Sequence, residues 1–362
     1  MVKKSIDKIL LFCTISLVAL GCLIIFGISA PFSQEIFGKT YWFLSHQILF
    51  GILPGVILGT FAFRTKIAQL KKITPVLYLA NLILVFFVFL PKIGLTLGGA
   101  KRWLKLGPIS FQPSEFLKIS LFLYLASWLE KNPRKDLQKL LIFCLILSPV
   151  VLALVLQPDI STLVLLVMVS FLMYFLADTP IWHTVLAISM AVSFLFLLMT
   201  TASYRMERLL VFLNPQIDPM GMGYQIKQAQ ISIGSGGIFG RGLGMSRQKF
   251  GFLPHPMSDS VFAIFAEETG LLGSLTLMIF FLLFFIRGLK IGKRAKDKFS
   301  QILAWGISLQ IILQTFLNIG AMAGILPLTG IPLPFVSYGG THIIVELTAV
   351  GLLLNISKNK AL

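Results

Sequence analysis

A few ionisable side chains lie inside or at the ends of long apolar runs, where a charge is energetically unfavourable unless it is paired or functional. At the centre of a bilayer each such charge costs about 2.5–3.5 kcal/mol. Carboxylates in these positions can pair with cations or act as general bases. The residues inside the runs are Glu115, Lys118, Glu267, Glu268 and Glu346, and the residues at run ends are Asp159 and Asp259.

Spacing restricts what these groups can do together. Glu115 and Lys118 are three residues apart, so they share a helix face and can form an ion pair. That pair either locks its helix to a neighbour or belongs to a polar cavity open to the outside. Glu267 and Glu268 are adjacent and point about 100° apart on a helix, so we expect that they do not both face one cavity and that one pairs structurally. Glu346 lies in the middle of a predicted helix and could equally be a buried, protonated packing residue.

Asp259 begins a long apolar run in FLPHPMSDSVFAIFAEETG (252–270). An Asp at this place is typical of an N-cap or of the first turn of a helix, where the helix dipole favours a negative charge. An Asp at the edge of a membrane can also accept a proton from a substrate hydroxyl. The position alone leaves both roles open.

Two segments rich in Gly or Pro predict unusual backbone. IGSGGIFGRGLGMSRQK (233–249) can bring backbone N–H groups and basic side chains near phosphates, although it matches no standard phosphate motif; a re-entrant loop is the alternative. GILPLTGIPLPFVSYGG (324–340) predicts irregular backbone, which at membrane depth must be buried in protein or line a cavity.

The composition defines the setting for these residues. Of 362 residues, 56% are hydrophobic and 12% charged, the mean hydropathy is +0.89 and the net charge is +17. Soluble domains are about 25% charged, so the chain is an integral membrane protein and not an ordinary soluble nucleic-acid binder. Cys13, Cys22 and Cys144 lie in apolar runs without metal or redox spacing, and the four His residues form no metal motif.

We predict an all-α polytopic membrane protein with about ten transmembrane helices, in a single domain covering 1–362. Each run is close to the length needed to cross about 30 Å of hydrocarbon. Prolines at 158 and 180 indicate tight turns between neighbouring runs. The first run is read as a retained helix rather than a signal peptide. The runs are 9–30, 43–63, 73–91, 113–129, 138–156, 160–177, 181–200, 259–286, 300–321 and 335–356.

The distribution of basic residues predicts the orientation. With both termini in the cytoplasm, 19 of the 31 Lys and Arg residues fall on the inner side, as the positive-inside rule requires. Ten of the eleven outer ones lie in the loops 92–112 and 201–258. The second loop is long, and its apolar and aromatic content predicts a structured extracytoplasmic loop.

Several long motifs resemble the SEDS family of FtsW, RodA and SpoVE over nearly the whole chain. The residues of these motifs are more similar to those of the FtsW members. The turn QPD (157–159) and the string GIPLPFVSYGG (330–340) belong to this resemblance. The other matching strings are GGAKRWLKLGPISFQPSEFLKISLFLYLA (98–126), YRMERLLVFLNPQIDPMGMGYQ (204–225) and IGSGGIFGRGLGMSRQK (233–249).

The resemblance implies a peptidoglycan glycosyltransferase that polymerises lipid II into glycan strands during cell division or elongation and releases undecaprenyl pyrophosphate. Asp259 matches the essential acidic residue of the family and would act as general base on the acceptor sugar hydroxyl. Cations would stabilise the leaving pyrophosphate, Glu115 would orient Lys118, and Asp159 would shape the cavity. The candidate substrate-binding residues are Arg102, Lys105, Glu115, Lys118, Asp159, Arg205, Arg208, Gln248 and Lys249.

The family motif is not matched at every position. His255, Met257 and Ser260 replace the usual neighbours of Asp259, and Ser161 and the pair 341–342 replace a Gly and two Ser residues elsewhere. The aspartate itself is present. The hypothesis that Asp259 is the base is therefore unchanged, whereas the family's substrate contacts around it cannot be carried over to His255, Met257 and Ser260.

The resemblance also implies partners: lipid II, a class B penicillin-binding protein (a transpeptidase), other divisome membrane proteins and no nucleic acid. The protein is expected in the inner (plasma) membrane of a bacterium. We assign no metal-ligating residues and no cofactor, and leave open whether Mg²⁺ or Mn²⁺ bridges the pyrophosphate. Two other functions remain compatible with the intramembrane polar groups: a lipid II flippase and a non-enzymatic divisome scaffold.

Overall fold

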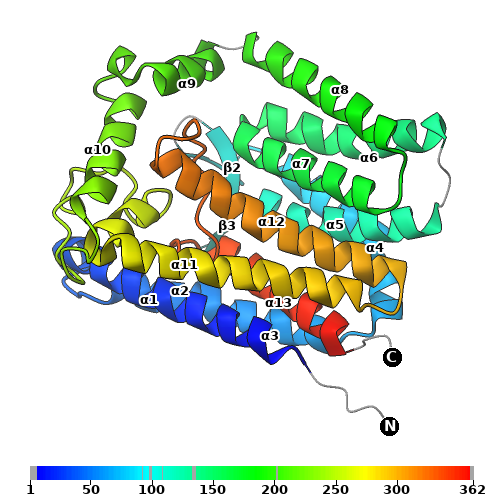
Figure 1. Cartoon of the computed structure of the whole chain (residues 1–362), viewed down its shortest axis with the longest axis horizontal. Helices are drawn as coiled ribbons and strands as arrows, with labels where there is room; N and C mark the ends of the chain where they lie inside the picture. Colours follow the sequence, from blue (N-terminus) through cyan, green and yellow to red (C-terminus); the bar gives the residue numbers. More distant parts are fainter. Residues whose placement is uncertain are drawn as a thin grey trace.

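The computed structural model describes residues 6–91, 93–97, 100–107, 109–132, 136–200 and 203–358. Its main body is a bundle of long helices that run roughly parallel, with shorter elements crossing one end (Figure 1). Each apolar run of the sequence coincides with a helix, and the second run is divided into three pieces. The helices of these runs are α1 (Lys8–Phe37), α2, η1 and α3 (Trp42–Gln47, Ile48–Ile52, Leu53–Arg64), α4 (Ile67–Phe87), α5 (Pro113–Lys131), α6 (Leu137–Leu156), α7 (Ile160–Leu176), α8 (Ile181–Thr200), α11 (Val261–Lys293), α12 (Lys298–Met322) and α13 (Gly340–Lys358).

Seven helical spans of the described chain are long and apolar enough to cross a membrane. They are the α1, α2–α3, α4, α6, α11, α12 and α13 spans, and α7 and α8 are shorter apolar helices. The 19-residue α5 carries Glu115, Lys118 and Glu130. The expected all-α polytopic class is confirmed, whereas membrane crossing by α5, α7 and α8 stays a prediction.

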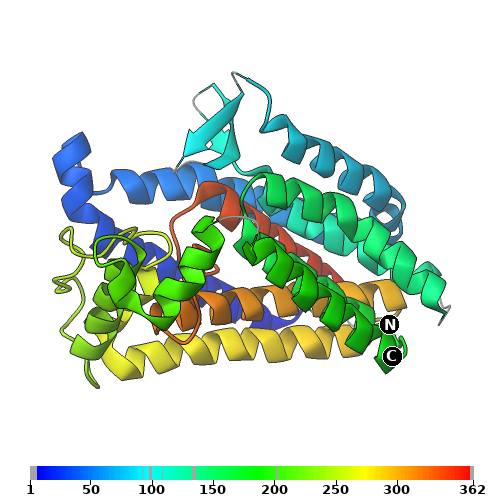
Figure 2. The ribbon, with the colours of Figure 1, turned by 90° about the horizontal axis from the view of Figure 1, so that it is seen from above.

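The long loop of the sequence analysis contains helices of its own. They are α9 (Ser203–Leu213), η2 (Pro215–Ile217) and α10 (Met222–Ser235). Residues 201 and 202, where this loop was predicted to begin, lie outside the described residues. The loop 92–112 adds a feature that the sequence analysis did not anticipate, a small antiparallel sheet in the order β1 (Gly94–Leu97), β2 (Ala100–Leu106) and β3 (Ile109–Phe111). The sheet stands at one side of the bundle beside the start of α5 (Figure 2).

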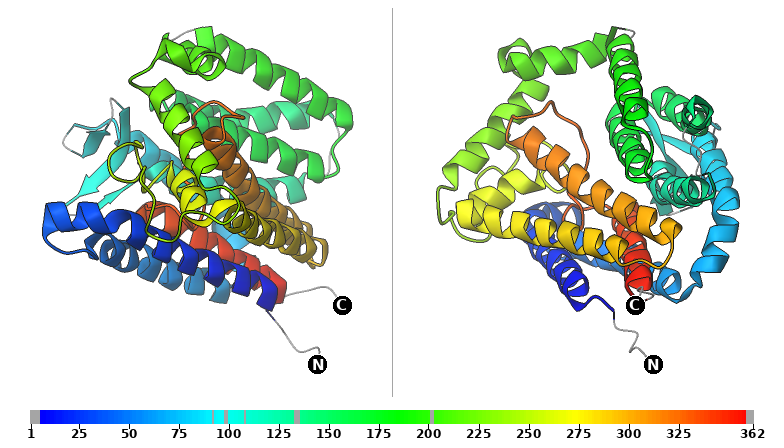
Figure 3. Two further views of the ribbon diagram at one scale, coloured as in Figure 1. Left: turned by 60° about the vertical axis from the view of Figure 1, so that its left-hand side comes forward. Right: turned by 45° about the vertical axis from the view of Figure 1, so that its right-hand side comes forward.

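α12 and α13 form the centre of the bundle, with α1, α3, α5, α7 and α11 packed around them. α13 lies directly against α3, where a Cβ on Gly351 would meet the carbonyl oxygen of Gly59 at 2.1 Å. Small residues let helices approach this closely, which is how packing is gained inside a membrane. Figure 3 shows α12 and α13 between the α11 side and the α4–α7 side of the bundle.

The two ends of the bundle differ. α1 begins and α13 ends at one end, where the backbone N–H of Asp7 donates to Ser357 Oγ at 3.1 Å and Arg287 pairs with Asp7 at 2.6 Å. We call this the terminal end. The opposite end, where α11 begins after Asp259, is called the site end (Figure 1).

Candidate functional site

Asp259 lies in a turn immediately before α11 and does not cap it. The N-cap residue is Ser260, whose hydroxyl donates to the carbonyl of Pro254 at 2.8 Å instead of capping the helix. Of the two roles that its position left open, the N-cap role is excluded, because the chain enters the helix one residue later. The Asp259 side chain is partly exposed, and within the described part of the chain its carboxylate makes no hydrogen bond or ion pair.

Two side chains fix the backbone of this turn. The amide nitrogen of Asn318 on α12 donates at 2.8 Å to the carbonyl of Asp259 and at 2.8 Å to that of Ile331. The hydroxyl of Ser337 donates to the carbonyl of Ser258 at 2.6 Å. Asn318 and Ser337 are both buried, so these bonds are shielded from water. The turn is thus held against residues 330–338, which we call the facing segment.

The end of the facing segment is held both by the Asp259 turn and by α2. The backbone N–H of Tyr338 donates to the carbonyl of Met257 at 2.8 Å, and the Tyr338 hydroxyl lies 2.9 Å from His46 Nδ1. Burial raises the pKa of Tyr338 to about 12, so its phenol stays protonated. Gln47 contributes a second contact, since its side-chain oxygen accepts from the backbone N–H of Gly339 at 3.1 Å. The irregular backbone predicted for 324–340 is therefore largely buried over 331–337, whereas 324–330 is partly or fully exposed.

Gly330 is the residue of the facing segment that lies opposite the carboxylate. A Cβ placed on Gly330 would lie 3.6 Å from Asp259 Oδ2, and its φ of +66° is a conformation that L side chains rarely adopt. The backbone here can form its turn without placing a side chain over Asp259. The carboxylate consequently keeps an open approach on this side.

A buried chain of charges lies behind the facing segment. Lys118 Nζ pairs with Glu115 Oε1 at 2.8 Å, and His342 lies between two carboxylates, 3.2 Å from Glu115 Oε2 and 2.9 Å from Glu346 Oε1. All four side chains are almost completely buried. The ion pair expected from spacing is present, and it joins α5 to α13 rather than standing alone.

Gln314 links this chain of charges to the facing segment. Its side-chain oxygen lies 3.5 Å from Lys118 Nζ, and its nitrogen donates to the carbonyl of Pro332 at 2.9 Å. Gln314 and Asn318 are four residues apart on α12, so they form successive amide contacts on one helix face. Lys118 therefore reaches the Asp259 turn only through other residues.

The Gly-rich region presents its backbone donors to the protein's own carboxylates. Glu267 accepts from the backbone N–H groups of Arg247 and Gln248 at 3.2 and 3.4 Å, and Glu268 accepts from that of Ser246 at 3.3 Å. Arrays of N–H groups of this kind bind anions, but here the anions are internal. We expected one of Glu267 and Glu268 to pair structurally, and both do, because the loop wraps around both.

Lys249 and Gln248 belong to this same internal arrangement. Lys249 Nζ pairs with Glu268 at 3.2 Å and donates to the carbonyls of Gly244 and Gly27 at 2.6 and 3.1 Å. Its side chain is almost fully buried, and the side-chain oxygen of Gln248 is buried as well. The structure does not bring either residue into hydrogen-bond contact with Asp259.

The predicted cations of the first outer loop lie on the sheet. Arg102 donates to the carbonyl of Gln157 at 3.2 Å and also to that of Pro158, so it holds β2 to the turn between α6 and α7. Lys105 is exposed on β2. Asp159 caps α7 by accepting from the backbone N–H of Thr162 at 3.4 Å, and its other oxygen lies 3.5 Å from the amide nitrogen of Gln112. These contacts explain why the sheet and turn stay together.

Arg205 and Arg208 lie on α9, which crosses the site end of the bundle away from the sheet (Figure 1). Both side chains are partly exposed and both have interactions within the protein. The predicted cations are therefore distributed over the sheet, α5, α9 and the Gly-rich region rather than gathered in one cluster.

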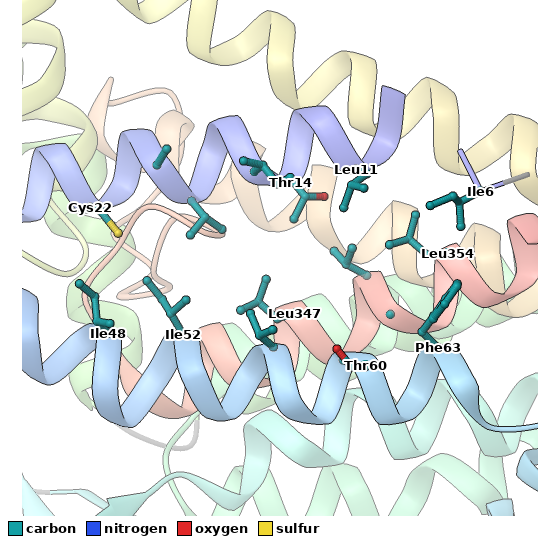
Figure 4. A pocket seen from close by; sticks show the side chains of 17 residues that line it. Ile6, Leu11, Thr14, Cys22, Ile48, Ile52, Thr60, Phe63, Leu347 and Leu354 are labelled. Carbon is teal, nitrogen blue, oxygen red and sulfur yellow. The ribbon is translucent and has the colours of Figure 1, made fainter. Parts of the chain in front are cut away.

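An apolar groove of about 540 Å³ lies away from this polar region, between α1 and α3 with α13 beneath it (Figure 4). Leu11 and Thr14 line one side, and Ile52 and Thr60 line the other. The residues described along this groove include no Asp, Glu, Lys, Arg or His. The groove offers apolar contact and no acid–base chemistry.

Several residues of the site were not predicted from the sequence, among them Asn318, Gly330 and His342. Asn318 and Gly330 had no local signal, because their importance depends on contact with a turn about 60 or more positions away. The spacing of His342 and Glu346, four residues apart on one helix, is a signal that could have paired them.

The fold and the site together define a class: a multi-pass helical membrane protein that holds, at one end of its bundle, a partly exposed carboxylate on a fixed turn. A family model described as "Cell cycle protein", FTSW_RODA_SPOVE, matches residues 7–362. The chain belongs to this FtsW/RodA/SpoVE family, and the resemblance seen in the motifs is confirmed.

Individual relatives match this chain over nearly their whole length. The chain is 38% identical over 360 residues to a probable peptidoglycan glycosyltransferase FtsW of Coxiella burnetii, covering 98% of this chain and 96% of that one. It is 35% identical to stage V sporulation protein E of Bacillus subtilis, covering 98% of each.

Solved structures match over 98% of both chains. One is a chain from a peptidoglycan synthase complex that coordinates polymerization and crosslinking, with a TM-score of 0.81 at 28% identity. Another is RodA of Thermus thermophilus, with a TM-score of 0.73 at 26% identity.

Proposed function

We propose that this protein is a peptidoglycan glycosyltransferase that polymerises lipid II, with Asp259 as the general base. The observation that carries the proposal is the Asp259 carboxylate itself. It is partly exposed, it has no ion pair or hydrogen bond in the described chain, and its backbone is fixed by Asn318. A carboxylate in this state is available to a substrate, and a fixed turn keeps it in place.

In this mechanism the acceptor sugar hydroxyl loses its proton to Asp259 as its oxygen forms a bond to the anomeric carbon of the donor. The bond from that carbon to the pyrophosphate oxygen breaks, and undecaprenyl pyrophosphate leaves. Exposed Lys105 and partly exposed Arg205 and Arg208 are the predicted cations that keep surface available for a lipid phosphate. Lys118 and Lys249 are buried against carboxylates, so we assign them to shaping the site.

A divalent cation at the pyrophosphate remains part of the proposal. The described residues contain no group of three or more His, Cys, Asp or Glu side chains placed to hold a metal ion. Mg²⁺ or Mn²⁺ would then take most of its ligands from the diphosphate and from water.

We further propose that the protein lies in the inner membrane of a bacterium with both termini in the cytoplasm, so that the site end faces outward. The excess of Lys and Arg on the terminal side supports this orientation. A class B penicillin-binding protein is the proposed partner, together with other divisome proteins. The structural relative from a synthase complex supports a partnered enzyme.

The test uses the full-length protein, purified with its transpeptidase partner and reconstituted with fluorescent lipid II. Asp259→Asn removes the base and keeps the shape, and we expect it to abolish glycan polymer on a gel. Glu207→Gln on the exposed face of α9 is the matched control and should polymerise normally. Undiminished polymer from the Asp259→Asn protein overturns the proposal.

The same preparations separate the two rival functions. A flippase would move fluorescent lipid II across proteoliposome membranes, as read by dithionite quenching, without making polymer and without needing Asp259. A scaffold would still recruit its partner and support division when Asp259 is replaced by alanine.

A further inference from the structure

The Gly-rich loop, defined as residues 236–253, carries an unusual set of exposed apolar side chains. Each is between 55% and 80% exposed, although the loop lies outside the membrane-spanning helices. Surfaces this apolar mark contact with a membrane or another protein. The residues are Ile238, Phe239, Leu243, Met245, Phe250 and Phe252.

Buried charges inside the Gly-rich loop prevent its six apolar side chains from packing into the loop interior. Glu267 accepts from Ser246 Oγ at 2.5 Å and from the backbone of the following two residues, and Lys249 is buried against Glu268. The interior of the loop is therefore filled mainly by the paired polar groups of Glu267, Glu268 and Lys249. An apolar side chain such as Phe239 could turn inward only by breaking them, which costs more than leaving it exposed.

The loop also folds back along the helices. The backbone N–H groups of Leu271 and Leu272 on α11 donate to the carbonyls of Gly237 and Ile238 at 2.9 and 3.2 Å. These two residues lie ten and eleven positions past the start of α11, directly after Gly270, where the helix is broken. The loop therefore runs back toward the bundle from the Asp259 turn instead of extending away from it.

Residue counts along α1 and α11 place the loop about one hydrocarbon thickness from the terminal end. Both counts start from the Asp7–Arg287 ion pair, which we take as the membrane boundary at that end. Twenty helical residues rise about 30 Å, the thickness of the hydrocarbon core. Counting 20 residues from Asp7 along α1 reaches Gly27, whose carbonyl accepts from Lys249 Nζ of the loop. Counting back from Arg287, the unbroken part of α11 reaches Leu271, whose N–H donates to the carbonyl of Gly237 in the loop.

The charge of this region suits anionic headgroups. Residues 219–258 contain four Lys or Arg residues and no Asp or Glu. Lys249 and Arg241 are paired with Glu268 and Glu267, and Arg247 is exposed. Apolar side chains flanked by an arginine are the usual composition of an interfacial membrane anchor.

We propose that the Gly-rich loop is a membrane anchor: its six exposed apolar side chains insert at the hydrocarbon edge of the leaflet at the site end, and Arg247 meets anionic headgroups. The anchor would fix the depth of Asp259, which follows the loop by only six residues. The inference concerns how the protein sits in a bilayer and does not depend on the proposed reaction.

The test is a depth measurement on the full chain in nanodiscs of phosphatidylethanolamine and phosphatidylglycerol. Cys13, Cys22 and Cys144 are replaced by alanine, and a nitroxide is attached at Phe239→Cys or Leu243→Cys. Leu23→Cys, exposed on α1 below Gly27, is the reference for lipid, and Lys39→Cys is the reference for water. We expect collisions with oxygen and with a water-soluble nickel complex at the loop positions to match those at Leu23.

Values at both loop positions that match Lys39 overturn the proposal. So does protection that arises only when the partner protein is added, because the surface would then belong to a protein interface. A second measurement needs no cysteine-free background. Photoreactive benzoylphenylalanine at position 239 should add the mass of one phospholipid on illumination in membranes, and an adduct to a protein instead counts against the anchor.

Discussion

The side-chain nitrogen of Asn318 donates to the backbone carbonyls of both Asp259 and Ile331 at 2.8 Å, so one buried amide joins the turn of the candidate base to the segment that faces it. The two carbonyls are 72 residues apart in the chain. This contact decides where the carboxylate lies relative to Gly330, and the predictions below start from it.

Asn318→Ala should slow polymerisation far more than it unfolds the protein. It leaves two buried carbonyls without a donor, a cost of about 1–3 kcal/mol, and it frees the Asp259 turn. A misplacement of about 1 Å at a reacting group can cost about 100-fold in rate. The measurements are the polymerisation rate and the thermal unfolding midpoint. Thr315→Val is the control on the same helix, since its hydroxyl bonds only within α12. Equal rates for the two variants would contradict the positioning role.

Gly330→Ala should reduce activity, and Gly339→Ala should not. At Gly330 the φ of +66° costs an alanine about 1–2 kcal/mol, and the new methyl group would lie 3.6 Å from Asp259 Oδ2, on the open approach to the carboxylate. Gly339 has no positive φ, and its added methyl would meet only His342 Cβ at an ordinary 3.5 Å. Polymer yield and unfolding midpoint are compared for the pair. Similar losses at both positions would show that the approach at Gly330 has no special role.

Lys118→Met should destabilise the protein strongly. It leaves the Glu115 carboxylate buried with only His342 beside it, and breaking a buried pair in this way costs about 3–5 kcal/mol. Lys298→Met breaks the exposed pair with Asp178, which should cost less than about 1 kcal/mol. A thermal-shift assay in detergent measures both. A smaller drop in the unfolding midpoint for Lys118→Met than for Lys298→Met would contradict the prediction that Glu115 depends on Lys118 for its stability.

Glu267→Gln should loosen the Gly-rich loop. The carboxylate accepts from Ser246 and from two backbone N–H groups, and hydrogen bonds to a charged group contribute about 1.5–3 kcal/mol, which corresponds to roughly tenfold or more in local opening. Trypsin cleavage after Arg247 in the purified protein should accelerate accordingly. Glu207→Gln, on exposed α9, should leave cleavage at Arg247 unchanged. A loop that is cut no faster in Glu267→Gln would show that the carboxylate does not hold it closed.

Helices were predictable because the signal for them is local. A segment that crosses hydrocarbon must satisfy its own backbone and present apolar side chains, so each run of about 20 apolar residues marks one helix. The break at Pro158 was visible for the same reason. The first helix is longer than its predicted run 9–30, because α1 continues through Pro31 to Phe37 with the loss of a single backbone hydrogen bond. The sheet at 94–111 was missed, since its strands are only three to seven residues long.

By itself the amino-acid sequence determined that the chain spans a membrane, where its helices lie and which aspartate resembles a catalytic base. Those properties depend on residue types and on spacing along one segment. Only the tertiary structure decided which charges are available. Lys249 and Lys118 read as candidate phosphate ligands in the sequence, but Glu268 and Glu115 neutralise them inside the bundle. A buried charge needs a partner that folding brings to within a few ångströms. The distance between two such residues cannot be predicted from their separation along the sequence. Asp259 is the acidic site residue for which folding provides a fixed backbone and, in the described chain, no such partner.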